Sequence, residues 1–110
     1  MQAGNLDRRV QFLRASLEDD GFQSRPGPFL PHGGEVWASK RDVSDSERFA
    51  AGSITAGMMT RFQVRYSAFT AGIRETDRLI CEGSTYAIIG IKELGRRVGL
   101  ELTCQRLEHA

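Results

Sequence analysis

Large apolar residues occupy every second position in two segments of the last third of the chain. Between residues 60 and 66 they are Phe62, Val64 and Tyr66, and between residues 98 and 104 they are Val98, Leu100, Leu102 and Cys104. Successive side chains of a β-strand point to opposite faces, so this period of two predicts strands with one buried and one solvated face. Both segments are therefore predicted to belong to a sheet.

The rest of the chain contains further short segments with the composition of strands, separated by turn residues. We expect strands over residues 8–14, 35–40, 60–66, 77–81, 85–91 and 98–107. Gly83-Ser84 fits a type II′ turn that would join two of them into a hairpin. These elements predict an all-β, mainly antiparallel fold, a small β-barrel or sandwich of about six strands with long loops and at most one short helix.

The first long connection covers residues 15–34 and contains all three prolines of the chain. Such a composition predicts a polar loop without a regular element. Asp19 and Asp20 precede Gly21 in this segment. They are interpreted as turn residues rather than as a catalytic pair of carboxylates.

The second long connection covers residues 42–59 and is open to two interpretations. Ser44 and Glu47 match a capping box, which would begin a short helix that ends at Gly52. Alternatively, the segment is an extended, mobile loop. A connection of about 18 residues is longer than compact domains usually need, and long connections of this kind are commonly functional or disordered.

The alternation also predicts which residues form the core. Residues on one face of each strand share a parity and should be buried together. We expect buried side chains at Val10, Phe12, Trp37, Phe62, Val64, Tyr66, Leu79, Ile88, Val98, Leu100 and Leu102. Trp37 is the only tryptophan, and we interpret it as a core anchor rather than a binding platform.

Length and composition exclude several classes of protein. The chain has 110 residues, which predicts one domain over residues 1–110, and its net charge of +1 gives no strong preference for polyanions or membranes. No apolar run approaches the roughly 20 residues that cross a bilayer. The N-terminal residues lack the apolar core of a signal peptide, so we expect a protein made and kept in a cytoplasm. Cys81 and Cys104 are predicted to be buried free thiols.

Catalytic constellations are missing from the sequence. Neither a glycine-rich phosphate loop nor a GxSxG motif occurs. His32 lies in a Gly/Pro-rich segment and His109 near the C-terminus, and neither has ligand spacing to a cysteine. We therefore expect no enzyme, no catalytic residues, no bound cofactor and no metal site.

Basic residues provide the candidate binding surface. Arg61 and Arg65 share one face of a predicted strand, and Arg96 and Arg97 lie at a predicted hairpin tip. One interpretation is a solvated sheet face whose arginines shield an edge. The other is a surface that meets a phosphate backbone or an acidic partner.

Several segments, taken in order, resemble one protein family. They are AGNLDRRVQF (3–12), EVWAS (35–39), a lone Glu47, TRFQVRYSAFTAGIRETDRLICEGSTYAIIGIKE (60–93) and LELTCQR (100–106). Together they resemble the head–tail joining family of tailed bacteriophages, also described as head completion or stopper proteins. The resemblance covers nearly the whole chain.

The resemblance implies a small β-barrel that forms a ring of identical subunits at the virion neck, assembled in the bacterial cytoplasm. The ring would lie between a portal-side adaptor and the tail proteins, including a tail terminator, and would help to retain or gate double-stranded DNA in the axial channel. Residues 42–59 would then project into the channel or against a neighbour, with Arg41, Asp42, Asp45, Glu47 and Arg48 as candidate contacts. The source would be a phage, a prophage or a gene-transfer particle. The alternative function is a stand-alone nucleic-acid-binding β-barrel.

Overall fold

The computed structural model describes residues 5–19, 24–43 and 59–107. Seven strands make up the described chain, and no α-helix occurs in these ranges. The strands are β1 (Arg8–Asp19), β2 (Ser24–Pro31), β3 (Val36–Asp42), β4 (Met59–Arg65), β5 (Arg78–Cys81), β6 (Ser84–Leu94) and β7 (Gly99–Arg106), with one 3-10 turn, η2 (Thr70–Gly72). The predicted short helix after Ser44 lies outside the described residues.

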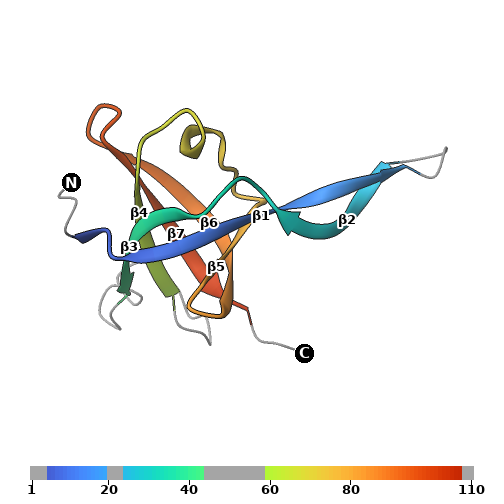
Figure 1. Cartoon of the computed structure of the whole chain (residues 1–110), viewed down its shortest axis with the longest axis horizontal. Coiled ribbons are helices and arrows are strands. Elements are labelled where there is room, and N and C mark those ends of the chain that lie inside the picture. The colour runs from blue at the N-terminus through green and yellow to red at the C-terminus, as the bar shows by residue number, and fades with distance from the viewer. Residues whose placement is uncertain (1–4, 20–23, 44–58, 108–110) are drawn as a thin grey trace.

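Six of the strands close into an antiparallel barrel, in the order β1-β3-β4-β7-β6-β5 and back to β1 (Figure 1). The strand β1 closes the ring because it changes partners along its length. It pairs with β3 through Arg8–Val10 and with β5 through Val10–Leu13. Leu13 pairs with both β5 and β2, and beyond the barrel the rest of β1, Arg14–Asp19, pairs with β2 alone. The predicted all-β antiparallel barrel is confirmed.

The outer part of β1 and the whole of β2 form a two-stranded ribbon that projects from the barrel (Figure 1). We call this ribbon, residues 13–19 and 24–31, the arm. The prediction of an irregular loop over residues 15–34 is therefore wrong for residues 15–19 and 24–31. Prolines are tolerated because β2 is an edge strand, and a register shift between Ala15 and Leu17 accommodates an extra residue of β2.

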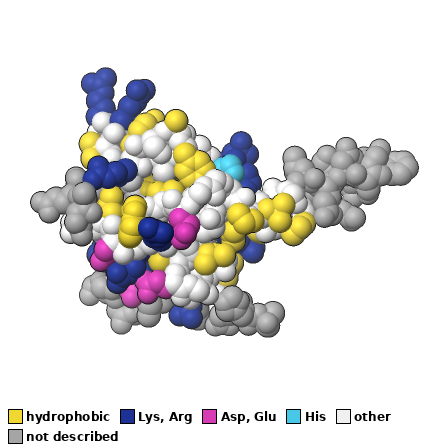
Figure 2. All heavy atoms as spheres, viewed as in Figure 1, with side chains coloured by type: hydrophobic (Ala, Val, Ile, Leu, Met, Phe, Trp, Pro, Cys, Tyr) yellow, Lys and Arg dark blue, Asp and Glu magenta, His cyan; other side chains and the backbone are white. Residues whose placement is uncertain are grey.

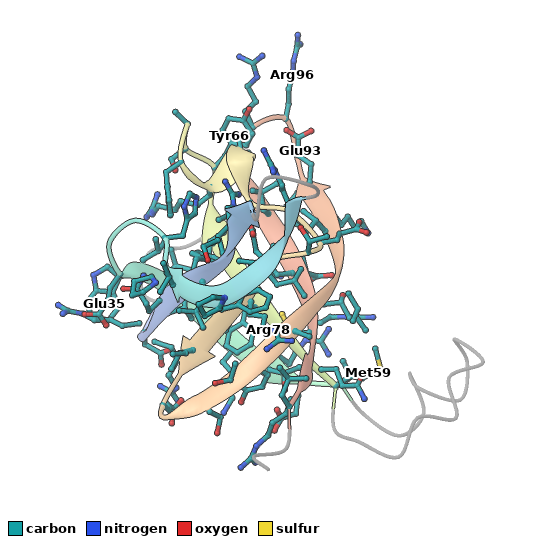
Figure 3. All side chains as sticks on the ribbon, turned by 90° about the vertical axis from the view of Figure 1, so that its right-hand side faces the viewer. Glu35, Met59, Tyr66, Arg78, Glu93 and Arg96 are labelled. Carbon is teal, nitrogen blue, oxygen red and sulfur yellow. The ribbon has the colours of Figure 1, made fainter. Side chains whose placement is uncertain are left out.

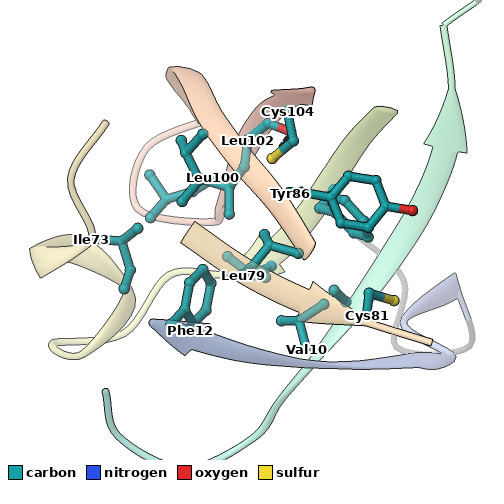
Figure 4. Close-up of a cluster of buried hydrophobic side chains, with 13 residues drawn as sticks. Val10, Phe12, Ile73, Leu79, Cys81, Tyr86, Leu100, Leu102 and Cys104 are labelled. Carbon is teal, nitrogen blue, oxygen red and sulfur yellow. Dashed lines mark hydrogen bonds between the residues drawn. The ribbon is translucent and has the colours of Figure 1, made fainter. Parts of the chain in front are cut away.

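The core lies inside the barrel and follows the predicted parity for most positions (Figure 4). The predicted core residues that are buried are Val10, Phe12, Phe62, Val64, Leu79, Ile88, Leu100 and Leu102. Tyr66 is only partly buried and packs against the cluster. The cluster also includes Cys81 and Cys104, which are buried free thiols as predicted.

Trp37 is not a core residue, which corrects the prediction. Its side chain is 50% exposed, whereas the neighbouring Ala38 is fully buried. Trp37 lies opposite Arg9 in register, and the Arg9 guanidinium carbon is 4.7 Å from the indole ring centroid. Three consecutive apolar residues begin β3, so the sequence alone could not fix which of them faces inward.

Val98 is also wrongly predicted as buried, since it is 47% exposed. The residue lies in the turn before β7 rather than in the strand. Arg97 in the same turn has a φ of 58°, a left-handed conformation that interrupts the alternation of side chains. The strand therefore begins at Gly99, one residue later than predicted, and the predicted parity holds from Leu100 onward.

The turn between β5 and β6 differs from the predicted type. Cys81 pairs with Ser84, so the two loop residues are Glu82 and Gly83 rather than Gly83 and Ser84. Their φ values are 51° and 81°. Two positive φ values are typical of a type I′ turn, whose twist matches that of the flanking strands, rather than of type II′.

Gly33 allows the chain after the arm to approach the loop before η2. Its φ is 71°, and a β-carbon at this position would overlap the ring of Phe69, which contacts His32 and Phe12. We expect Gly33→Ala to lower the free energy of unfolding by about 1–3 kcal/mol in urea denaturation. Gly34→Ala is the matched control, because its β-carbon would meet no atom within 4 Å. Equal losses for the two variants would contradict this role.

Candidate docking surface

The candidate basic residues do not form one group. Arg61 and Arg65 face outward on β4, whereas Arg96 and Arg97 lie in the exposed turn after β6. Figure 3 shows Arg96 projecting near the Tyr66 end of β4, far from the Met59 end near which Arg61 lies. The predicted basic surface is therefore divided between a barrel wall and a turn.

Arg61 instead lies next to Arg41, one of the residues expected to contact the channel or a neighbouring subunit. Arg41 on β3 lies directly opposite Arg61 in register. Asp42 is exposed, and its Oδ1 accepts a hydrogen bond of 3.1 Å from the Thr60 hydroxyl. The remaining candidates of that group, Asp45, Glu47 and Arg48, lie outside the described residues.

Arg41 and Arg61 line an open pocket on the outer wall of the barrel, with a volume of about 340 Å³. The wall is formed by β3, β4 and the residues that lead into β1. The lining residues are Asn5, Asp7, Ser39, Lys40, Arg41, Arg61 and Gln63. The sequence did not reveal this pocket, because the register between β3 and β4 was needed to bring its residues together.

The pocket has an excess of positive charge, with three cationic side chains and one carboxylate in its lining. Carboxylates at its border reduce this excess. Glu101 lies 3.9 Å from the Arg61 Nε and accepts a hydrogen bond of 3.1 Å from Gln63, while Glu82 lies 3.8 Å from the Lys40 Nζ. Guanidinium and amide donors of this kind suit the oxygen atoms of a carboxylate or a phosphate.

Trp37 and Arg9 border this pocket on the same wall. Trp37 precedes the pocket residue Ser39 by two positions on β3, so both point to the outer side of the sheet. We call this surface, the pocket together with Arg9, Trp37 and Arg65, the basic face. It combines a half-exposed aromatic ring with several arginines, the residue types that dominate binding energy at protein interfaces.

Where the arm leaves the barrel, Arg14 and Asp77 form a bidentate ion pair. The Arg14 Nε and Nη2 atoms each lie 2.9 Å from a carboxylate oxygen of Asp77, and Nη2 also donates to the Gly72 carbonyl at 2.9 Å. The backbone N–H of Arg74 donates to Asp77 at 2.8 Å. This cluster fixes the base of the arm against the loop that contains η2.

Burial of Asp77 acts to raise the pKa of its carboxyl group. Hydrogen bonds from the Arg14 side chain and from the Arg74 backbone, together with the charge of Arg14, outweigh that effect and lower the pKa below its ordinary value. The pKa of Arg14 is raised, mainly by the hydrogen bonds to Asp77. The pair is therefore ionised at neutral pH.

The part of the arm next to the barrel has an apolar face. By register, Leu13, Ala15, Phe29 and Pro31 share this face. The Arg78 guanidinium carbon is 4.0 Å from the Phe29 ring centroid at the end of the arm nearest the barrel. Figure 2 shows apolar side chains gathered where the arm leaves the barrel. Leu30, on the other side of the ribbon, is 51% exposed.

The described residues contain no group of three or more His, Cys, Asp or Glu side chains that could hold a metal ion. Within the same ranges, no helix is long and apolar enough to span a membrane.

Both cysteines should resist thiol reagents in the folded protein. Burial raises the pKa of the Cys104 thiol to about 12. The pKa of the Cys81 thiol is raised mainly by burial and to a smaller extent by the nearby charge of Glu82. Because the thiolate is the reactive form, we expect negligible labelling by a chromogenic disulfide reagent at pH 8 and reaction of both thiols in denaturant. Rapid labelling of the native protein would contradict the packing of the core.

Comparison with known proteins identifies a matching family and a similar solved structure. Residues 1–107 match the family model described as phage head completion protein. The solution structure of protein SF1141 from Shigella flexneri 2a has a similar fold, with a TM-score of 0.73 and 25% sequence identity over 96% of each chain. No curated protein sequence matches the chain.

Proposed function

Because this chain belongs to the phage head completion protein family, we propose that it joins the DNA-filled head to the tail as a ring at the virion neck. Family membership gives a structural rather than an enzymatic role in the phage head–tail region. The finer assignment to the neck is our proposal. It is carried by the family match over nearly the whole chain.

The architecture is consistent with a joining protein. A closed barrel gives a rigid body, and the arm offers a surface that the rest of the described subunit does not cover. We propose that the ring contacts a portal-side adaptor on one side and tail proteins, including a tail terminator, on the other. Residues 42–59 would contact the channel or a neighbour and would help to retain double-stranded DNA.

We further propose that the subunit is a monomer in dilute solution and forms a ring only on the portal-side platform. A joining protein that closed rings by itself would assemble away from its docking site. The net charge of +1 gives little repulsion between subunits, so the restriction must come from contacts that become ordered on the platform. Light scattering at low micromolar concentration tests this point, and a stable closed ring without partners would contradict it.

Deletion of the gene from the phage or prophage that carries it tests the proposed function. We expect DNA-filled heads that lose their DNA or lack tails when purified particles are viewed by electron microscopy, and rescue by a plasmid copy. Normal tailed particles from the deletion strain would refute the assignment. A salt-sensitive shift of short DNA by the pure protein, with normal particles, would instead favour the stand-alone nucleic-acid-binding module.

A further inference from the structure

We propose that the arm accepts an extended segment of another protein as a third strand, along the open edge of β1 between Ala15 and Asp19. This inference rests on the proposed joining function and names the kind of contact through which the subunit would hold a neighbouring neck protein. Strand addition of this kind derives its affinity from backbone hydrogen bonds and its specificity from every second side chain.

The backbone hydrogen bonds show which residues of β1 face β2. The N–H of His32, the residue after β2, donates to the Phe12 carbonyl at 2.8 Å. Since the residues of an antiparallel strand bond to alternate sides, Arg14, Ser16 and Glu18 also face β2. The extra residue at the register shift belongs to β2, so the alternation along β1 continues. The odd-numbered residues of β1 therefore face the other side of the strand.

The strand β5 occupies only the first part of that other side. It pairs with β1 as far as Leu13 and no further. The next residues on this edge are Ala15, Leu17 and Asp19, and no strand of the described chain pairs with them there. Figure 1 shows the arm extending clear of the barrel. The N–H and C=O groups of this edge recur roughly every 7 Å, a spacing that another extended backbone matches.

The opposite edge of the arm, formed by β2, is closed to an added strand by proline. Leu13 and Leu17 face away from β2, so their partners Pro31 and Pro26 direct their backbone toward the outer edge of the ribbon. Proline has no N–H to donate, and natural sheets use it at edges to prevent pairing. The β1 edge contains no proline over residues 15–19. Protection of one edge alone indicates that the other edge has an occupant.

The side chains beside the open edge indicate the chemistry of the added segment. Leu13, Ala15 and Phe29 lie on one face of the arm, and a strand added beside Ala15 would place every second side chain on that face. Because Ala15 is small, a large apolar residue opposite it would extend toward Phe29. The segment is therefore expected to be extended, with apolar residues at alternate positions.

A different protein fits this edge better than the arm of a second copy. The proline-containing edge of β2 does not offer a full ladder of donors to a neighbouring β1. Two open β1 edges could pair with each other about a two-fold axis, but that contact closes at two subunits and builds no ring. A strand from another protein also stabilises the arm, since an isolated two-stranded ribbon is marginally stable in water.

Proline substitution at the open edge tests the proposal in particles. Leu17→Pro removes an N–H that faces away from β2, so the hydrogen bonds within the arm remain. The variant should lower the yield of tailed, DNA-filled particles on the order of tenfold in a complementation assay, because the added strand loses a bond and meets the proline ring. Leu17→Val is the matched control. It keeps the N–H in a residue that favours strands, and it should assemble normally.

Amide exchange in the free protein shows whether the edge is open and whether the variant keeps its arm. We expect slow exchange at Leu30 and His32, whose N–H groups face β1, in both the wild type and Leu17→Pro. The Ala15 and Leu17 amides of the wild type should exchange fast. Slow exchange of these two amides in the pure monomer would overturn the proposal, because the edge would already be covered within the subunit.

Photo-cross-linking in purified particles identifies the occupant without a proline variant. A chain with p-benzoylphenylalanine in place of Leu17 should cross-link to a segment of a different virion protein, and mass spectrometry should show apolar residues at alternate positions in that segment. Capture of a segment of this same chain would overturn the choice of partner. Absence of any protein cross-link from intact particles would overturn the contact itself.

The outcomes separate this inference from the proposed function. If deletion of the gene abolishes tailed particles but Leu17→Pro assembles normally, the strand contact is refuted and the neck assignment stands. Equal defects in Leu17→Pro and Leu17→Val would also refute the contact, since the loss would then come from the side chain rather than from the backbone N–H. Normal tailed particles from the deletion strain would refute the neck assignment and, with it, the partner named here.

Discussion

Phe62→Ala is expected to lower the free energy of unfolding by about 3–5 kcal/mol, which is among the largest single losses in this protein. Phe62 is fully buried at the middle of β4, and its ring meets the Tyr86 ring edge-on with centroids 5.1 Å apart. Truncation would remove apolar contacts and leave a cavity that the closed barrel cannot collapse to fill, because antiparallel neighbours hold β4 on both sides. Urea denaturation at neutral pH measures the loss.

Trp37→Ala is the matched control for this substitution. It removes a larger aromatic residue from the neighbouring strand, but the side chain is half exposed and its main contact is with Arg9. We expect a loss of about 1 kcal/mol or less. A loss below about 1 kcal/mol for Phe62→Ala, or a greater loss for Trp37→Ala, would show that the inward and outward faces of this wall have been exchanged.

Asp77→Asn is expected to lower the free energy of unfolding by about 2–4 kcal/mol. The carboxylate is buried and accepts hydrogen bonds from both Arg14 and the backbone of Arg74. Removal of the Asp77 charge leaves the Arg14 guanidinium without its counter-ion. Loss of one partner destabilises the fold because the remaining charge is no longer compensated. The expected loss lies toward the lower part of the usual range because the Arg14 side chain is 29% exposed and keeps part of its hydration.

The same pair predicts how stability depends on pH. Since the pKa of Asp77 is lower in the folded chain than its ordinary value of 3.8, its contribution to stability is fully present above that value. The contribution is lost as the pH falls through the folded pKa. The difference between the wild type and Asp77→Asn should therefore be large at pH 7 and should shrink below about pH 3.8.

A conservative variant nearby serves as the control for Asp77. Glu75→Gln removes a charge of the same sign from an exposed position in the same loop, and we expect a change within about 0.5 kcal/mol at all pH values. An Asp77→Asn effect that stayed constant between pH 7 and pH 2.5 would show that the loss comes from packing rather than from the ion pair.

The barrel could be predicted from the sequence because strands with one buried face alternate apolar and polar residues. Phe62 and Val64 on β4, like Leu100 and Leu102 on β7, alternate with polar residues, and each proved to face the core. The prediction failed where the local pattern was ambiguous. Consecutive apolar residues around Trp37 do not reveal a parity, and the left-handed Arg97 shifts the start of the last strand.

The arm and the pocket could not be predicted for different reasons. The prolines and glycines of residues 24–31 have poor propensity for a strand, yet pairing with β1 overrides that propensity at an edge. The pocket depends on which residues of β3 and β4 are opposite each other. That register places Arg41 beside Arg61 across 20 positions of sequence, a relation that no local pattern contains.

The continuity of β1 from the barrel into the arm has a mechanical consequence. A pull on the arm along its axis loads β1 lengthwise, so the backbone hydrogen bonds to β3 and β5 are sheared together rather than opened one at a time. The bidentate ion pair between Arg14 and Asp77 lies where the arm meets the barrel and resists the first displacement of β1. A subunit held by its arm would therefore yield at high force in single-molecule extension, whereas the same chain held through β2 would unzip from β1 at low force.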